Sequence, residues 1–180
     1  MADDNLFAIR LVTPERVLVS GITTEVVLRT REGDITFLAG SAPLVGTVEP
    51  GVVRVTGTGE AEGEVQRVAI HGRFVQVEQH VTPEGEAETE ALEGSATATR
   101  VTILAAVAEL SEEIDVERAR TAHDGAEAKV AELAGAAGGR TTGEDDEIDP
   151  DLAEAQAALV RAEVRLEATE AVVTAAASTA

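Results

Sequence analysis

The residues best suited to metal or acid–base chemistry are three histidines, His71, His80 and His123. His71 precedes a turn glycine, His80 borders an acidic stretch, and His123 falls within a helical pattern. None of them has a nearby partner at the spacing of metal ligands, and the chain contains no cysteine. The sequence therefore predicts no metal site, no disulfide and no thiolate chemistry.

Motifs for phosphate or nucleophilic chemistry do not occur in the sequence either. There is no GxxxxGK[ST] loop, and Gly57, Gly59 and Gly63 do not form GxGxxG. No nucleophile-elbow motif marks a Ser–His–Asp arrangement, and the carboxylates are too numerous for one acid/base pair to stand out. The chain is therefore not expected to be an enzyme that acts alone.

The charge of the chain bears on its partners. Its 34 acidic and 14 basic residues give a formal net charge of −20, and Lys129 is the only lysine. Nucleic acids require a Lys/Arg stripe, so a nucleic-acid partner is not expected. Without a run of about 18 apolar residues or a secretory signal, direct bilayer insertion is not expected. The expected location is the cytosol or an assembly facing it.

The elements that must position any site begin with short β-branched runs separated by turn signals, from about Leu6 to Leu104. The predicted strands are Phe7–Val12, Val17–Ser20, Thr24–Thr30, Asp34–Leu38, Val52–Thr56, Val65–Ile70, Phe74–Glu78 and Val101–Ala105. Many short strands with closely spaced turns favour a β-sandwich over a βαβ fold. Alternation along Arg73–Glu78 is taken to place Phe74, together with Ile70, toward the core.

The predicted sandwich spans residues 1–110 and contains an acidic insertion at about 80–98. This insertion carries five glutamates together with Pro83, Gly85 and Gly94. Little apolar surface is available there to offset the entropy lost on ordering. The sequence therefore predicts a solvated loop inserted into a hairpin.

After Leu110 the apolar residues recur at alternating steps of three and four, which predicts an antiparallel hairpin of two helices over residues 111–180. The seam positions are Val116, Ala119, His123, Ala126, Val130 and Leu133, then Leu152, Ala155, Leu159, Ala162, Leu166, Thr169 and Val173. A flexible loop is predicted at about 135–149, and Asp149-Pro150-Asp151 is expected to cap the second helix. The fold class is thus mainly β plus α, a sandwich followed by a hairpin whose alanine-rich seams bury little area.

Short segments occur in a set order along the chain. They are Val12-Thr13-Pro14-Glu15-Arg16, Ser20-Gly21, Thr30-Arg31-Glu32-Gly33-Asp34, Leu38-Ala39-Gly40-Ser41-Ala42-Pro43-Leu44, Glu49-Pro50-Gly51-Val52-Val53-Arg54-Val55, Val101-Thr102-Ile103-Leu104-Ala105 and Ile114-Asp115-Val116-Glu117-Arg118-Ala119. In this order they resemble the epsilon chain of bacterial F-type ATP synthase over nearly the whole length. One departure is Ala39-Gly40-Ser41-Ala42-Pro43, where that family usually has Pro-Gly-His-Ala-Pro.

The resemblance implies a non-catalytic central-stalk (rotor) subunit of a proton-translocating F-type ATP synthase, peripheral on the cytoplasmic face of the cell membrane. The sandwich would contact the gamma subunit and the c-ring and couple them during gradient-driven ATP synthesis. The turn of Glu32, Gly33 and Asp34 is the implied c-ring contact. The hairpin would extend toward the catalytic alpha/beta hexamer and restrain ATP hydrolysis. The alternative is a stand-alone nucleotide-sensing or adaptor module with a coiled-coil tail.

No cofactor is required by this role, but the resemblance also implies ATP as a regulatory ligand of the folded hairpin. The matching positions are Glu109, Asp115, Arg118, Ala119, Arg161 and Arg165. Arg161 and Arg165 have no acidic residue three or four positions away, and their like charges cost the helix about 0.2–0.5 kcal/mol. A bound polyphosphate would reverse that cost, because arginine forks suit phosphate oxygens.

A structural explanation of the same residues stands beside the ATP hypothesis. Both arginines would pair across the hairpin with Glu117, Asp124 or Glu127, and the aspartate of the Ile114–Ala119 segment would cap its helix or pair within it. A further arginine of the family pattern is Gly125 here, which removes one cation from any anion site.

Overall fold

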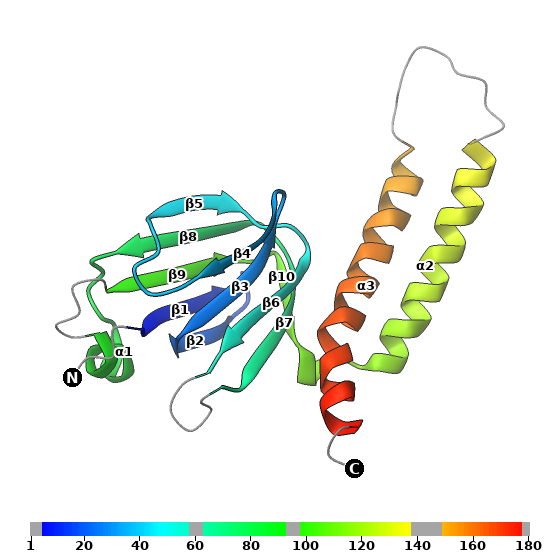
Figure 1. Ribbon diagram of the computed structural model, residues 1–180. Helices are drawn as coiled ribbons and strands as arrows, with labels where there is room; N and C mark the ends of the chain where they lie inside the picture. The colour runs from blue at the N-terminus through cyan, green and yellow to red at the C-terminus, as the bar shows by residue number, and fades with distance from the viewer. Residues whose placement is uncertain (1–4, 58–62, 93–97, 138–148, 178–180) are drawn as a thin grey trace. The chain divides into compact units, whose positions relative to one another are not determined.

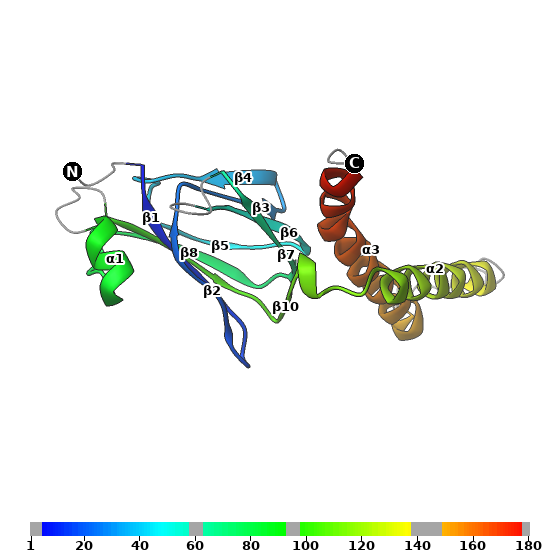
Figure 2. The same ribbon diagram turned by 90° about the horizontal axis from the view of Figure 1, so that it is seen from below.

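The computed structural model describes residues 5–57, 63–92, 98–137 and 149–177. It divides into two units, Met1–Ser111 and Glu112–Ala180, each of which is described by itself. The first unit contains two five-stranded β-sheets that pack face to face, and the second contains two helices (Figures 1 and 2). The predicted fold class, a β-sandwich followed by a helical hairpin, is confirmed.

The first sheet, called the β1 sheet, has the strand order β2-β1-β9-β8-β5. These strands span Val17–Thr23, Phe7–Val12, Thr99–Leu104, Phe74–Gln79 and Leu44–Thr47. The second sheet, called the β3 sheet, has the order β10-β7-β6-β3-β4. Its strands span Val107–Leu110, Val65–His71, Gly51–Thr56, Glu25–Thr30 and Gly33–Phe37. Neighbouring strands are antiparallel except β1 and β9, which pair in parallel.

The core lies between the sheets and is built mainly from Val, Ile and Leu. Its largest fully buried side chains include Phe7, Ile9, Leu11, Leu28, Phe37, Ile70 and Ile103. Alternation along the strands determines which side chains face the core. In β6, for example, every second residue is buried, namely Gly51, Val53 and Val55. The prediction that Ile70 faces the core is confirmed, since it is 1% exposed.

The acidic segment after His80 contains a helix, α1 (Gly85–Leu92), so the prediction of a solvated loop is wrong for these residues. Leu92 is buried and packs with Ala8 and Ala98, and α1 contacts β1 and β2 at the outer face of the β1 sheet (Figure 2). One buried leucine contributes about 1.5–3 kcal/mol, which is little for ordering a helix. A second source of stability is therefore needed.

Ion pairs supply that second source. The buried Arg100 guanidinium contacts Glu88 at 2.7 Å and Glu84 at 3.2 Å and donates to the Thr82 carbonyl at 3.1 Å. Arg10 pairs with the other oxygen of Glu84 at 2.9 Å. The hydrogen bond from Arg10, then the positive charge of Arg100, hold the pKa of the Glu84 carboxyl below its usual range. Charge complementarity thus orders a segment whose hydrophobicity is too low to predict it.

The second unit is an antiparallel pair of helices, α2 (Val116–Ala137) and α3 (Pro150–Ala177), which contact each other along their length (Figure 1). The predicted seam residues whose side chains are described are all buried or half-buried. The start of α3 is capped as predicted, because the Asp151 N–H donates to Asp149 Oδ1 at 3.0 Å. The predicted loop at 135–149 begins too early, since α2 continues through Gly135; residues 138–148 lie outside the described part.

No helix in the described part of the chain has both the length and the apolar character needed to cross a bilayer.

Gly125→Ala is expected to stabilise α2. Gly125 is an exposed residue of the helix, and a Cβ added there would meet no atom within 4 Å. Alanine favours a helix interior over glycine by about 0.8–1.0 kcal/mol, so the free energy of unfolding of the hairpin should rise by about that amount. Thermal unfolding followed by far-UV circular dichroism measures the change. A lowered melting temperature would contradict the expectation.

Candidate functional site

The turn between β3 and β4 carries the predicted c-ring contact, Glu32-Gly33-Asp34. Gly33 has φ 126°, a backbone conformation that only glycine adopts readily. Asp34 accepts a hydrogen bond from Arg29 Nε at 3.1 Å, and its second oxygen lies 3.8 Å from Arg54. Glu32 is exposed. The turn therefore presents two exposed carboxylates, of which Asp34 is ion-paired, and strands hold it on both sides.

An apolar row crosses four strands on the outer face of the β1 sheet and consists of Val17, Val12, Leu104 and Phe74. Each residue lies opposite the next in the strand register. Phe74 is 48% exposed, Leu104 43% and Val17 55%, whereas Val12 is half-buried. An exposed apolar stripe of this kind is typical of a protein–protein contact. Sequence reasoning missed this exposed row.

The prediction that Phe74 faces the core is wrong. Val75 and Val77, which alternate with it on β8, are 1% and 2% exposed and occupy the inward positions. Val75 and Val77 point to one face of the strand and Phe74 to the other, and two apolar residues on one face outweigh a single one on the other. The sequence therefore did indicate which face of β8 is buried. The aromatic side chain is left on the outer face, beside Leu104.

The segment Ala39-Gly40-Ser41-Ala42-Pro43, which departs from the family pattern, is held by hydrogen bonds from Leu38 and Gln79. The Leu38 N–H donates to Ser41 Oγ at 3.0 Å. Gln79 Nε2 donates to the carbonyls of Gly40 and Ser41 at 2.9 and 3.1 Å. The Ser41 hydroxyl therefore closes this turn within the sandwich.

The candidate ATP residues of the Ile114–Ala119 segment lie at the start of α2. Asp115 caps the helix, because the Arg118 N–H donates to Asp115 Oδ1 at 3.0 Å and the Ala119 N–H to its carbonyl at 2.9 Å. Ala119 is buried at 3% exposed, whereas the Arg118 side chain is exposed. The capping explanation of Asp115 is confirmed, and Arg118 remains open to solvent.

The two arginines of α3 differ in their surroundings. Arg161 is exposed and makes no hydrogen bond or ion pair with any described residue, whereas Arg165 is half-buried and interacts with another residue. The predicted pairing of Arg161 across the hairpin with Glu117, Asp124 or Glu127 is wrong, because Arg161 forms no ion pair with these residues and Glu117 pairs with Arg120 at 2.7 Å. Glu109 is half-buried in β10 and belongs to the first unit.

Comparisons with known proteins identify the family. Residues 6–83 match the beta-sandwich domain of the ATP synthase delta/epsilon chain, and residues 112–170 match its long alpha-helix domain. A chain of the Euglena gracilis mitochondrial ATP synthase has a similar fold, with a TM-score of 0.53 and 22% identity, covering 95% of this chain and 81% of that one.

Curated relatives carry the same family name. The ATP synthase epsilon chain of Thermobifida fusca is 42% identical over 128 residues, which make up 71% of this chain and 79% of the relative. The ATP synthase epsilon chain of Desulfitobacterium hafniense is 30% identical over 162 residues, or 90% and 95% of the two chains. With both domains matched in order, this chain belongs to the family of ATP synthase epsilon chains.

Proposed function

We propose that this chain joins the gamma subunit to the c-ring in the central stalk of an F-type ATP synthase on the cytoplasmic face of the cell membrane. Membership of the family makes it a non-catalytic stalk subunit, and the catalytic work belongs to other chains. The alternative of a stand-alone nucleotide-sensing or adaptor module is not favoured. The observation that carries the proposed contact with gamma is the apolar row.

The apolar row supports a protein contact because the core beneath it is already complete. Val75, Val77 and Ile103 fill the inner face of the same strands and are at most 2% exposed. The exposed surface of Phe74 and Leu104 therefore does not contribute to the core, and in the free protein this apolar surface is in contact with water. Covering such surface stabilises a complex by about 25 cal/mol per Å² of apolar area. We assign the gamma subunit as the partner that covers it.

The β3–β4 turn is the proposed contact with the c-ring. Its backbone conformation is fixed by Gly33, and Asp34 is fixed by Arg29 and Arg54. A turn held in this way loses little conformational entropy when a partner binds. Glu32 and Asp34 would then face donor groups of the c-subunit loops.

The hairpin is the proposed element that restrains ATP hydrolysis by extending toward the catalytic alpha/beta hexamer. The buried seam residues of its helices include Ala119, Ala155 and Ala162, whose side chains are small. Small side chains give a seam with little buried area per turn, so the helices separate at low cost. A weakly held hairpin suits a regulatory element that changes partners.

The contact with gamma is tested by Phe74→Ser. Phe74 is half-exposed, so the sandwich should remain folded, while the complex loses an aromatic anchor worth about 1.5–3 kcal/mol. The dissociation constant for purified gamma should rise about tenfold or more, as measured by surface plasmon resonance. Val45→Ser is the matched control, because Val45 is 74% exposed but lies outside the apolar row. Equal binding by Phe74→Ser and the unchanged chain would refute the assignment.

We also propose that ATP is a weak regulatory ligand of the hairpin, bound through Arg118, Arg161 and Arg165. Exposed Arg118 and Arg161 support it, since neither guanidinium has an ion pair with a described residue. Replacement of a family arginine by Gly125 weakens the site, so binding is expected only near millimolar ATP.

Calorimetric titration with ATP tests this ligand. Arg161→Ala should weaken binding about tenfold, because it removes a phosphate-binding cation. Arg120→Ala is the control, since Arg120 is exposed and already paired with Glu117. Absence of heat at millimolar ATP, or an equal effect of the two substitutions, would contradict the proposal.

A further inference from the structure

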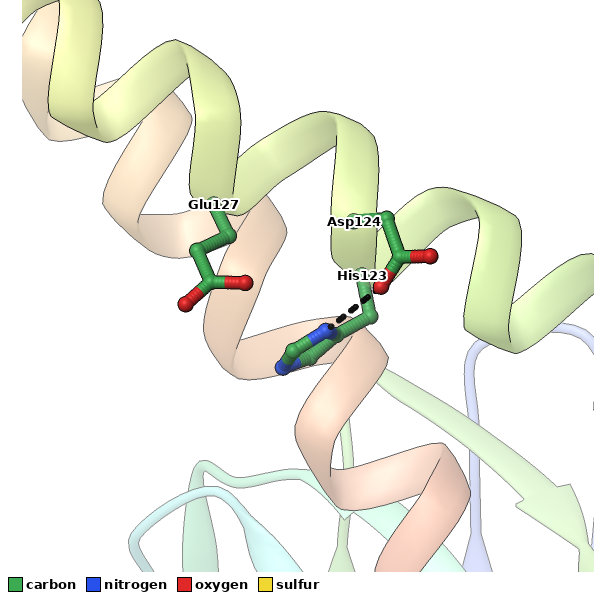
Figure 3. Close-up of side chains that lie close together, drawn as sticks. All are labelled: His123, Asp124 and Glu127. Atoms are coloured by element: carbon green, nitrogen blue, oxygen red, sulfur yellow. Dashed lines mark hydrogen bonds and ion pairs between the residues drawn. The ribbon is translucent and has the colours of Figure 1, made fainter.

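Three side chains with metal-binding atoms lie together on α2. Figure 3 shows His123, Asp124 and Glu127, with the imidazole between the two carboxylates in that view. One ligand atom from each of the three lies within 4.8 Å of the other two. The sequence predicted no metal site at His123, because carboxylates are so common in this chain that two near a histidine did not stand out.

The distance between the first two groups suits a shared cation better than a hydrogen bond. His123 Nδ1 and Asp124 Oδ1 are 3.4 Å apart, whereas N–H···O bonds are usually about 2.7–3.2 Å. Two ligands bound tetrahedrally to one Zn²⁺ at about 2.0–2.2 Å are themselves separated by about 3.4 Å. This spacing is compatible with two ligands of one metal ion, and an oxygen of Glu127 lies within 4.8 Å of both.

The charge around the cluster favours a cation. The nearby bases of α2 are engaged elsewhere, since Arg120 pairs with Glu117 and Lys129 pairs with Glu132. Within the described residues, neither carboxylate of the cluster has an ion pair with lysine or arginine. Two such carboxylates three positions apart repel each other. A bound cation would remove this repulsion.

We propose that His123, Asp124 and Glu127 bind one divalent metal ion of the zinc class. An imidazole nitrogen with two carboxylate oxygens suits Zn²⁺ and its transition-metal neighbours, whereas Mg²⁺ and Ca²⁺ prefer sites built from oxygen alone. Water would complete the coordination, because His123 is 27% exposed and both carboxylates lie on the surface.

The site would regulate the hairpin. His123 occupies a seam position of α2, and the three ligands span one helical turn. A ligand that binds the folded helix but not the unfolded chain stabilises the fold by linkage. Metal binding would therefore favour the intact α2. This inference needs only α2 and does not depend on the contacts with gamma or the c-ring.

Zn²⁺ titration of the full chain in excess Mg²⁺ tests the site by calorimetry, because Mg²⁺ occupies nonspecific carboxylate positions. One Zn²⁺ should bind per chain and raise the melting temperature of the helical signal. Asp124→Asn and Glu127→Gln keep the side-chain shape on an exposed surface, and each should weaken binding at least about tenfold. His123→Ala should abolish it.

His80→Asn is the matched control, because it removes an exposed histidine outside the cluster. Asparagine tolerates the positive φ of 54° at that position, and Zn²⁺ binding should be unchanged. The proposal is overturned if Zn²⁺ binds no more tightly than Mg²⁺. It is also overturned if Asp124→Asn and Glu127→Gln bind Zn²⁺ as the unchanged chain does.

Discussion

Gly72→Ala is expected to unfold the β-sandwich or to destabilise it severely. Gly72 joins β7 to β8, and a Cβ there would overlap the carbonyl oxygen of Val48 and lie 2.5 Å from its carbonyl carbon. These are backbone atoms, and the Val48 N–H donates to the Arg73 carbonyl at 3.3 Å, so neither segment can move aside alone. The free energy of unfolding should fall by about 3 kcal/mol or more, a large share of a typical domain's 5–15 kcal/mol.

Denaturant unfolding followed by far-UV circular dichroism measures this loss, since the chain has neither Trp nor Tyr for fluorescence. Gly21→Ala is the control. Gly21 lies in β2, and a Cβ there would meet nothing within 4 Å. The control should unfold at the same denaturant concentration as the unchanged chain or a higher one. A Gly72→Ala chain that matches it would show that the close approach to Val48 does not exist.

Glu88→Ala should release α1 from the sandwich. Glu88 is 5% exposed and is the nearest partner of Arg100, which is 8% exposed. Removing one partner of a buried ion pair costs about 3–5 kcal/mol, and the remaining contact with Glu84 places the loss near the lower end. The buried Nε of Arg100 already lacks a hydrogen-bond partner in the described structure. No nearby acceptor among the described residues is therefore available at Nε to take the place of the Glu88 carboxylate.

Hydrogen exchange of the amides of α1 measures this release. Glu90→Ala is the control, because Glu90 is an exposed glutamate of the same helix. Exchange should accelerate in Glu88→Ala and stay unchanged in Glu90→Ala. The double substitution Glu88→Ala, Arg100→Met should recover part of the protection, since it no longer buries an unpaired charge. If both single substitutions behaved alike, the ion pair would not be what holds α1.

Much of the fold could be predicted from the sequence because periodicity reports burial. The short apolar run Phe7–Val12, followed by a turn signal, predicted β1 with its observed bounds, and steps of three and four predicted the seam of α2. The strands β5 and β10 were not predicted. Each has four residues, which is too short for alternation to be distinguished from chance. Pairing with β8 and β7 creates them, and pairing is a tertiary effect.

The helix α1 could not be predicted for a related reason. Its ion pairs join Glu88 to Arg100 and the preceding Glu84 to Arg10 and Arg100, and hydrophobic periodicity does not report such pairs between charged side chains. Surface features that depend on the pairing of distant strands are equally hard to predict from the sequence. The cap formed by Asp115 is local and was foreseen, whereas the apolar row exists only once four strands are in register.

The parallel pairing of β1 with β9 also constrains how the protein is made. Ala8 lies beside Arg100, so β1 has no permanent neighbour on that side until β9 has been synthesised. Contacts between such distant residues slow folding, because the entropy of closing a long loop is lost before the contacts that stabilise it can form. The apolar residues of β1 therefore stay exposed on that side while the intervening chain is synthesised, and the surplus of negative charge on the polypeptide opposes aggregation during that time.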